Sequence, residues 1–253
     1  DEDIDIPMKI LITGGNGRLG KLLKEEFLEA GYTVHTPTRL EVDWSSAVES
    51  NKAIERKGYG LIIGCAAYTD VQKAETDKAK CHTDTYATAL NTARAAKLHN
   101  VPFVYISSDY VIPIIRGEGG GVYAQAKYRA ECAVIREGGR IVRVAFTTEE
   151  QVRNWSFVNA YSKSNRWWVD EAVKPLMESI KDSTLPQVHE IGPEIPVTPC
   201  DLLEKRFPDH PALLNKVSRP EQMKELVGYA APSDSTFFNY RNGTKNLRWS
   251  RLT

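Results

Sequence analysis

The sequence predicts an α/β fold in which a Rossmann-like, doubly wound parallel sheet is followed by a smaller C-terminal region. From Met8 onward, short apolar runs alternate with longer amphipathic segments about four times over. The apolar runs are rich in Ile, Val and Leu and are bounded by Gly or Pro, which is typical of strands buried on both faces. Parallel strands need long, right-handed crossovers, so we expect helices on both sides of the sheet.

The expected elements follow one another in a regular order. Strands are expected at residues 8–13, 32–37, 59–67, 101–108 and 140–146, and helices at residues 17–31, 46–58, 76–100 and 123–139. Apolar residues at three- and four-residue spacing support the helices. The alternation stops at about residue 147, so we predict one domain over residues 8–147 and a smaller region over residues 148–253. That region includes a helix-like stretch at residues 167–181. We expect it to pack over the open edge of the sheet, with the option that part of it joins the sheet.

Composition and charge exclude several classes of partner. Lys plus Arg and Asp plus Glu both number 33, so the chain has no general attraction to nucleic acid or to a membrane surface. Its longest apolar runs are far shorter than the roughly 20 residues that cross a bilayer. The four cysteines are widely spaced and the five histidines show no metal-ligand spacing, so we expect reduced thiols, a cytoplasmic protein and no metal site.

A glycine-rich loop follows the first expected strand. Gly14, Gly17 and Gly20 stand between that strand and the next helix, where they permit a tight turn and close approach of backbone N–H groups to a pyrophosphate. This context favours dinucleotide binding over a turn without a ligand. The residues of the loop expected to contact the cofactor are Gly14, Asn16, Gly17, Arg18 and Leu19.

The residues after the second expected strand indicate which dinucleotide is bound. A carboxylate there would bind the ribose 2′-hydroxyl of NAD, whereas a basic side chain would accept the 2′-phosphate of NADP. The chain has Arg39 at this point, with Arg18 in the glycine loop. We therefore expect NADP to be preferred, with NAD as a second possibility.

A serine, a tyrosine and a lysine form the candidate catalytic group. Ser107 and Ser108 end the fourth expected strand, at the sheet edge where open α/β sheets bind ligands. Tyr123 and Lys127 are four residues apart on one helical face, so the ammonium can lie beside the phenol and lower its pKa. Tyr123 would then exchange a proton while a serine hydroxyl binds a carbonyl oxygen.

Five ordered motifs make the chain resemble an extended short-chain dehydrogenase/reductase, most like the dTDP-4-dehydrorhamnose reductase family. They are "ILITGGNGRLG", "VDWSS", "GCAAYTDVQKAETD", "YISSDYV" and "YAQAK". The resemblance implies an NAD(P)-binding domain, a C-terminal substrate-binding region, and reduction of a nucleotide-linked 4-keto-6-deoxy sugar in dTDP-rhamnose biosynthesis; a homodimer is a further expectation. It assigns ketone polarisation to Ser108, proton delivery to Tyr123, and binding of the nicotinamide ribose to Lys127. The implied cofactor contacts elsewhere are Asp43 and Trp44 at the adenine, and Cys65, Ala66, Ala67 and Tyr68 along the cofactor channel.

Three departures from the family pattern leave alternatives open. The loop before Tyr123 is shortened, Ala124 replaces a glycine, and Thr85 stands where the family typically has an asparagine. An epimerase or dehydratase of the same superfamily would use the same catalytic residues. The regulatory beta subunit of methionine adenosyltransferase resembles the same family, so a non-catalytic dinucleotide-binding subunit is the other alternative.

Overall fold

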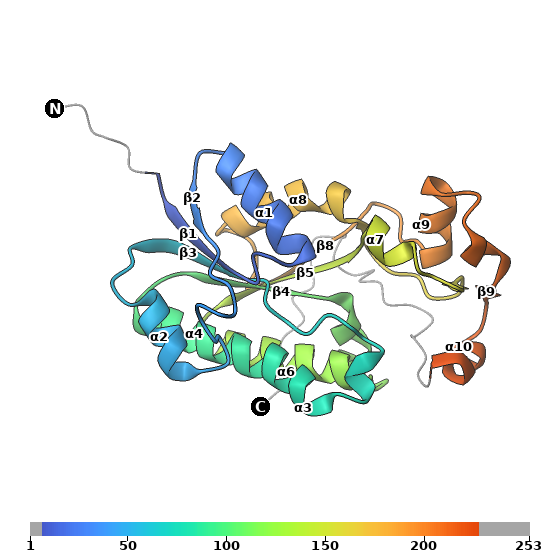
Figure 1. Cartoon of the computed structure of the whole chain (residues 1–253), viewed down its shortest axis with the longest axis horizontal. Coiled ribbons are helices and arrows are strands. Elements are labelled where there is room, and N and C mark those ends of the chain that lie inside the picture. Colours follow the sequence, from blue (N-terminus) through green and yellow to red (C-terminus); the bar gives the residue numbers. More distant parts are fainter. Residues whose placement is uncertain (1–6, 228–253) are drawn as a thin grey trace.

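The structure of the protein is a computed structural model that describes residues 7–227. A central sheet lies between two layers of helices, and a smaller group of short elements extends from one end of the sheet (Figure 1). None of the described helices combines the length and the apolar character that crossing a membrane would require.

Within residues 7–227, seven strands form one sheet in the order β2-β1-β3-β4-β5, with β7 and β8 both next to β5. Every strand pairing in this sheet is parallel. The strands are β1 (Lys9–Thr13), β2 (Thr33–His35), β3 (Tyr59–Gly64), β4 (Phe103–Ser107), β5 (Arg140–Thr147), β7 (Arg166–Trp168) and β8 (Val188–Ile191). The order reverses between β1 and β3, which is the position where open parallel sheets bind ligands.

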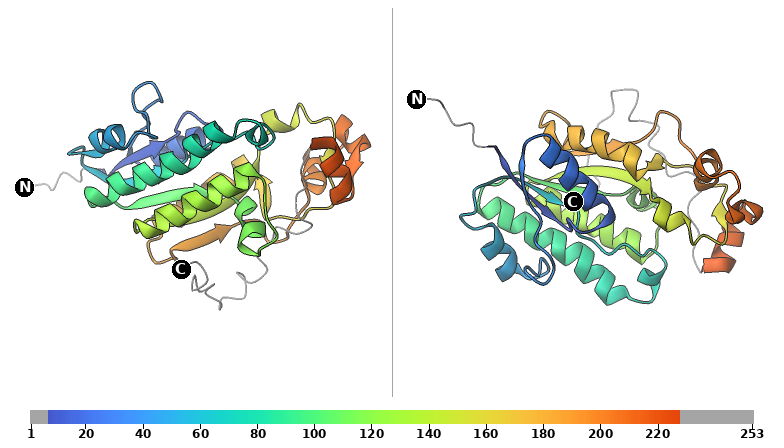
Figure 2. Two further views of the ribbon diagram at one scale, coloured as in Figure 1. Left: turned by 90° about the horizontal axis from the view of Figure 1, so that it is seen from below. Right: turned by 45° about the horizontal axis from the view of Figure 1, so that its top comes forward.

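The long helices cover both faces of the sheet. On one face α1 (Arg18–Glu29) packs against α8 (Val169–Lys181), and on the other α2 (Ala47–Ile54), α4 (Thr88–Leu98) and α6 (Val122–Arg136) lie side by side (Figure 2). The buried faces of these helices are apolar: Leu23 and Phe27 of α1 contact the first face, and Ala93 and Val134 contact the second. The predicted fold class, a doubly wound parallel sheet, is therefore confirmed.

The chain leaves the carboxyl end of β5 into the smaller group of elements (Figure 1). Thr148 and Thr198 start α7 (Glu149–Val152) and α9 (Pro199–Arg206) with capping boxes, in which each threonine side chain and a side chain three residues later satisfy backbone N–H groups. The elements of this part are α7 (Glu149–Val152), β6 (Val158–Asn159), α9 (Pro199–Arg206), β9 (Lys216–Val217) and α10 (Pro220–Val227). β6 and β9 form a two-stranded parallel sheet.

Residues 166–191 of the predicted C-terminal region belong to the main sheet and its helical layer. β8 pairs with the first half of β5 and β7 with the second half, so the two strands share one edge. Trp167 and Trp168 were expected in a helical stretch, but both lie in β7 and the helix begins at Val169. Their backbone is extended because it pairs with Phe146 and Thr147 of β5.

The remaining elements are short and lie in the connections. They are α3 (Lys78–His82), a π-helical turn (Thr83–Ala87), α5 (Ile112–Ile115), and the 3₁₀ turns Lys73–Glu75, Asp109–Val111 and Pro211–Leu214. α3, the π-turn and α4 run on as one helical segment, where the sequence predicted a single helix over residues 76–100. The turn Asp109–Val111 and α5 were not expected from the sequence; they occupy the shortened loop before Tyr123.

Candidate active site

The glycine loop has the shape that the sequence predicted for a phosphate-binding turn. Gly14 has a φ of +67°, and a Cβ atom built on it would lie 2.6 Å from the backbone nitrogen of Ala66. A Cβ atom on Gly20 would lie 2.3 Å from the carbonyl oxygen of Gly14. Only glycine fits these two positions, because a methyl group would strike backbone atoms in each.

The loop also leaves the start of α1 open to an anion. Gly17 caps α1 without a side-chain hydrogen bond, so the first N–H groups of the helix have no side-chain acceptor. Asn16 and Arg18 are exposed at this turn, and Leu19 is buried in the core below it. Free N–H groups at a helix N-terminus suit a pyrophosphate, so the residues present fit the dinucleotide that the sequence implied.

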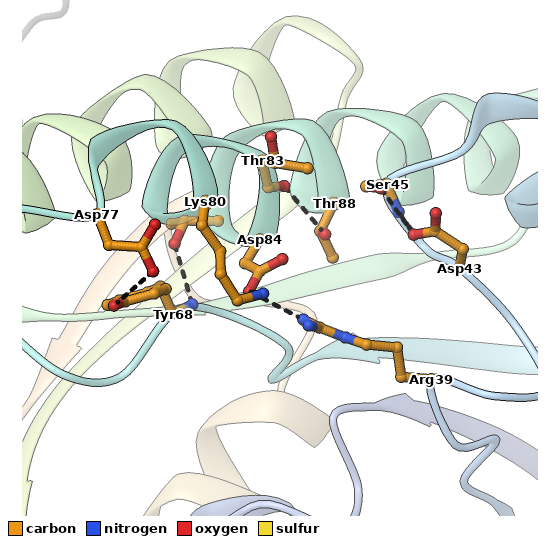
Figure 3. A network of polar contacts seen from close by, with 10 residues as sticks. Arg39, Asp43, Ser45, Tyr68, Asp77, Lys80, Thr83, Asp84 and Thr88 are labelled. Carbon is orange, nitrogen blue, oxygen red and sulfur yellow. Dashed lines mark hydrogen bonds and ion pairs between the residues drawn. The ribbon is translucent and has the colours of Figure 1, made fainter. Parts of the chain in front are cut away.

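The two arginines considered for the 2′-phosphate point to different elements. Arg18 lies 3.9 Å from Glu150 of α7, whereas Arg39 lies 3.1 Å from Asp84 of the π-turn. Lys80 of α3 contacts the same Asp84 carboxylate (Figure 3). Arg39 therefore crosses from the loop after β2 to the helical segment that follows β3.

Asp43 and Trp44, expected at the adenine, differ in exposure. The carboxylate of Asp43 is exposed and accepts hydrogen bonds from the backbone N–H and the hydroxyl of Ser45, which hold its pKa below the ordinary value (Figure 3). The indole of Trp44 is buried in the core layer below α2 and α4. Contact of the Trp44 side chain with a cofactor stays a prediction.

The segment Cys65–Tyr68 follows β3 directly and packs on the glycine loop. Ala66 donates its backbone N–H to the Thr13 hydroxyl over 3.4 Å, and burial raises the pKa of the Cys65 thiol to about 12. Ala67 is half-buried and Tyr68 is buried. This segment therefore lies beside the carboxyl end of β1, at the switch point of the sheet.

Thr85 supports this segment from the π-turn. Its hydroxyl accepts a hydrogen bond of 3.1 Å from the backbone N–H of Tyr68, and the hydroxyl of Tyr68 donates to Asp77 (Figure 3). Thr85 and Tyr68 are both buried, so loss of the threonine hydroxyl would remove the acceptor of a buried backbone N–H. Thr85 thus performs a positioning role at the place where the family pattern has asparagine.

Ser108 and Tyr123 lie around the carboxyl end of β4, linked by Tyr110. The hydroxyl of Ser108 donates to Asp109 over 3.1 Å and accepts the backbone N–H of Tyr110. The ring of Tyr110 meets the ring of Tyr123 edge to face, with 5.5 Å between centroids. Within the part of the chain that the structure describes, no hydrogen bond of the Tyr123 hydroxyl occurs.

Lys127 is buried between α6 and β4. Its ammonium donates to the hydroxyl of Tyr105 over 2.9 Å and to the carbonyl of Ile106 over 2.8 Å, and it lies 4.3 Å from the centroid of the Tyr105 ring. Burial lowers the pKa of Lys127 to about 8. Tyr105 is the partner that sequence reasoning missed, although it stands inside the quoted motif "YISSDYV".

The predicted lowering of the Tyr123 pKa is wrong for this structure. Burial raises the pKa of Tyr123, and the neighbouring Tyr110 and Asp109 act in the same direction. The Lys127 ammonium donates its hydrogen bonds to Tyr105 and Ile106 of β4, and no hydrogen bond from it to Tyr123 occurs among the described residues. Tyr123 consequently holds its proton at neutral pH.

Two further polar groups lie at the same edge: Ser107, which the sequence placed there without a role of its own, and Arg166, which sequence reasoning did not single out. The hydroxyl of Ser107, next to Ser108, is buried and has no hydrogen-bond partner among residues 7–227. Arg166 of β7 donates to the carbonyl of Phe146 and to the hydroxyl of Thr147 at the end of β5. No group of three or more His, Cys, Asp or Glu side chains suited to a metal ion occurs among the described residues.

Comparison with protein families gives one match over most of this region. The model described as the RmlD substrate binding domain matches residues 8–165. This range contains all five motifs and every site residue that the sequence predicted, whereas Arg166 lies just beyond it. The match therefore covers β1 to β5, whereas β7 and β8 of the same sheet lie beyond it.

Curated relatives are similar over about half of their own length. A dTDP-4-dehydrorhamnose reductase of Mycolicibacterium smegmatis is 28% identical over 152 residues, which are 54% of this chain and 45% of the relative. A probable dTDP-4,6-dihydroxy-2-methyloxan-3-one 4-ketoreductase of Streptomyces antibioticus is 33% identical over 160 residues, 58% of this chain and 50% of the relative.

Solved structures share the fold over almost the whole chain. A dTDP-4-dehydrorhamnose reductase of Bacillus anthracis, solved in complex with NADP, has a TM-score of 0.75 at 22% identity and covers 95% of this chain and 93% of its own. A dTDP-4-dehydrorhamnose reductase of Clostridium acetobutylicum has a TM-score of 0.77 at 20% identity and covers 92% of this chain and 91% of its own. At these identities the likeness concerns the fold.

Proposed function

Since this chain belongs to the RmlD substrate-binding domain family and is an extended short-chain dehydrogenase/reductase, we propose that it is an NADP-preferring reductase of a nucleotide-linked 4-keto-6-deoxy sugar. The observation that supports the proposal most is that Ser108 follows β4 directly, that Tyr110 contacts both Ser108 and the Tyr123 ring, and that Lys127 donates to the Ile106 carbonyl in β4. The names of the curated relatives support this substrate class.

The N-terminus of α1, the glycine loop and the segment Cys65–Tyr68 would hold the dinucleotide, with Arg39 at its adenosine end. When bound, NADPH supplies the hydride that a carbonyl reduction needs. Preference for NADP over NAD rests on the positive charge that follows β2. The structure of a related reductase in complex with NADP supports this choice.

The chain's own residues would handle the proton and orient the ketone. Tyr123 holds a proton at its hydroxyl at neutral pH, which is the state required of a proton donor to the carbonyl oxygen. The Ser108 hydroxyl can turn from Asp109 to donate to the same oxygen, where negative charge develops. The Lys127 ammonium stands one helical turn from Tyr123 and would bind the nicotinamide ribose.

The test is to mix the protein with NADPH and a panel of nucleotide-linked 4-keto-6-deoxy sugars while following loss of the reduced nicotinamide. We expect one class of sugar to be consumed with one oxidised cofactor formed per product. Tyr123→Phe should reduce turnover about 10²–10⁴-fold while NADPH affinity stays unchanged, because only the transferable proton is removed. Tyr128→Phe, on the same helix, is the matched control and should remain active.

The alternatives give different results in the same assay. An epimerase or dehydratase would change the sugar without net loss of NADPH. A regulatory subunit would bind NADPH, and the wild-type protein would reduce none of the sugars. Either result would refute the reductase proposal.

A further inference from the structure

Two cations and one carboxylate meet where the loop after β2 crosses the helical segment behind β3. Nη2 of Arg39 lies 3.1 Å and Nζ of Lys80 lies 2.7 Å from the same Oδ2 atom of Asp84 (Figure 3). Because both donors contact one oxygen, the two cationic groups are themselves close neighbours. Two positive charges therefore face one negative charge among these three side chains, and Asp43 is a further acidic group that interacts with Arg39.

The three side chains differ in exposure in a way that suits an incoming anion. The side chain of Asp84 is 13% exposed, whereas those of Arg39 and Lys80 are 66% and 51% exposed. The carboxylate therefore sits beneath two solvent-facing cations. An anion arriving from solvent meets the guanidinium and the ammonium first.

The loop that carries Arg39 is held in place independently of Asp84. The backbone N–H and the hydroxyl of Thr38 both donate to the carboxylate of Glu41, at 2.7 Å and 2.8 Å. Farther along, Asn91 of α4 donates to the carbonyl of Ser45 over 2.6 Å. These bonds close the turn around Arg39 and attach the loop to α4, so the guanidinium can exchange partners while its backbone stays in place.

We infer that Lys80 acts with Arg39 as a second ligand for the 2′-phosphate of NADP. A phosphomonoester carries about 1.5 to 2 negative charges near neutral pH and has several acceptor oxygens, so it competes effectively with a single carboxylate for two cations. The inference rests on the proposed function, because it requires that a dinucleotide binds at the glycine loop. The preference for NADP over NAD would then depend partly on a residue of α3. In doubly wound folds this preference is usually set by a residue after the second strand.

A matched control lies near the C-terminal end of α4. Arg94 and Lys97 both lie 3.2 Å from the carboxylate of Glu137, which repeats the pattern of two cations on one acid. This second cluster lies near the C-terminal end of α4, from which the chain enters the amino end of β4, so it is remote from the glycine loop. Removal of Lys97 tests whether any exposed lysine of this kind affects cofactor affinity.

The experiment measures the dissociation constants of NADPH and NADH by fluorescence titration for the wild-type protein and for Lys80→Ala, Lys80→Arg, Arg39→Ala and Lys97→Ala. We expect Lys80→Ala to weaken NADPH binding about tenfold and NADH binding less than twofold, since one charge-assisted contact to the phosphate is lost. In Lys80→Arg and Lys97→Ala, the ratio of the NADPH and NADH dissociation constants should equal that of the wild-type protein. Calorimetry repeats the comparison with ligands that lack the nicotinamide. Lys80→Ala should weaken binding of 2′,5′-ADP, which carries the 2′-phosphate, more than binding of 5′-AMP, which lacks it.

The opposing results are distinct. If Lys80→Ala changes both affinities equally, or neither, then Lys80 is not a phosphate ligand, although the proposed function stands. In the expected outcome, the nearly unchanged NADH affinity of Lys80→Ala also shows that this variant is folded. If the wild-type protein binds neither dinucleotide, the proposed function itself fails, and this inference fails with it.

Discussion

Lys127 is buried and Glu190 is half-buried with one buried carboxylate oxygen, and desolvation moves their pKa values in opposite directions. Burial raises the pKa of Glu190 to about 8 and lowers that of Lys127 to about 8, because a low-dielectric surrounding disfavours the charged form of each. One carboxylate oxygen of Glu190 accepts a bond of 3.0 Å from Asn165, and the other has no hydrogen-bond partner among the described residues. A protonated Glu190 therefore suits its site better than a charged one.

This residue predicts a specific dependence of stability on pH. The pKa of Glu190 lies above the roughly 4.3 of an unfolded glutamate, so the folded state binds more protons between these values and its stability falls as pH rises. The slope from this one group approaches about 1.4 kcal/mol per pH unit. We expect Glu190→Gln to flatten the decline, making the variant more stable than the wild type near pH 8.

Denaturant unfolding at several pH values checks this prediction. Glu194→Gln, which changes an exposed glutamate four residues later, serves as the control and should leave the pH profile unchanged. An unchanged slope in Glu190→Gln would contradict the argument. That result would mean that Glu190 is charged in the folded protein.

At the scale of elements, the contact between the glycine loop and α1 decides which substitutions are tolerated. Gly20 is inside α1, where alanine normally stabilises a helix by roughly 0.5–1 kcal/mol relative to glycine. Here the added Cβ atom would lie 2.3 Å from the Gly14 carbonyl oxygen and 2.7 Å from the Gly15 Cα atom. The close approach of helix and loop therefore overrides helix propensity.

We expect Gly20→Ala to destabilise the protein by about 1–3 kcal/mol and to weaken NADPH binding, because backbone atoms of the loop must move to admit the methyl group. Thermal unfolding and a fluorescence titration measure the two effects. Lys21→Ala, at the next and exposed position of α1, should change neither. A gain of stability in Gly20→Ala would show that the loop can yield without cost.

At the scale of the whole molecule, Arg206 joins the smaller C-terminal part to the sheet and its helices. From α9 its guanidinium makes two bonds to Asp170 at the start of α8, at 3.1 Å and 2.9 Å. It also contacts Glu149 of α7 and lies 4.5 Å from the Trp168 ring centroid. One planar cation thus holds three helices and the end of β7 together, a use that favours arginine over lysine.

We expect Arg206→Ala to destabilise the protein by about 1–3 kcal/mol and to make the C-terminal part easier to cleave by proteases, because the bidentate pair and the aromatic contact are lost together. The stability of Arg206→Lys should lie between those of Arg206→Ala and the wild type, because lysine keeps the positive charge but lacks the planar guanidinium that binds a carboxylate through two hydrogen bonds. Denaturant unfolding and limited proteolysis measure both effects. Arg153→Ala, an exposed arginine after α7, is the control; equal effects of the two alanine variants would contradict the role of Arg206.

The sequence alone was sufficient for the parallel sheet and the glycine loop, and it predicted a grouping of Ser108, Tyr123 and Lys127 that stays a prediction. These features rest on local patterns: buried strands alternate with amphipathic helices, glycine follows the first strand, and Tyr123 and Lys127 are one helical turn apart. These patterns depend on neighbouring residues in the sequence and not on tertiary contacts, so the observed strands and helices lie close to the residues expected for them.

Only the tertiary structure decided which groups these residues contact and how those contacts change them. The partner of Lys127 is Tyr105, the partner of Arg39 is Asp84, and Thr85 binds the backbone of Tyr68. Each pair joins two elements whose register and burial no local pattern specifies. The raised pKa of Tyr123 has the same origin, because desolvation depends on everything packed around the hydroxyl and not on the lysine four residues away.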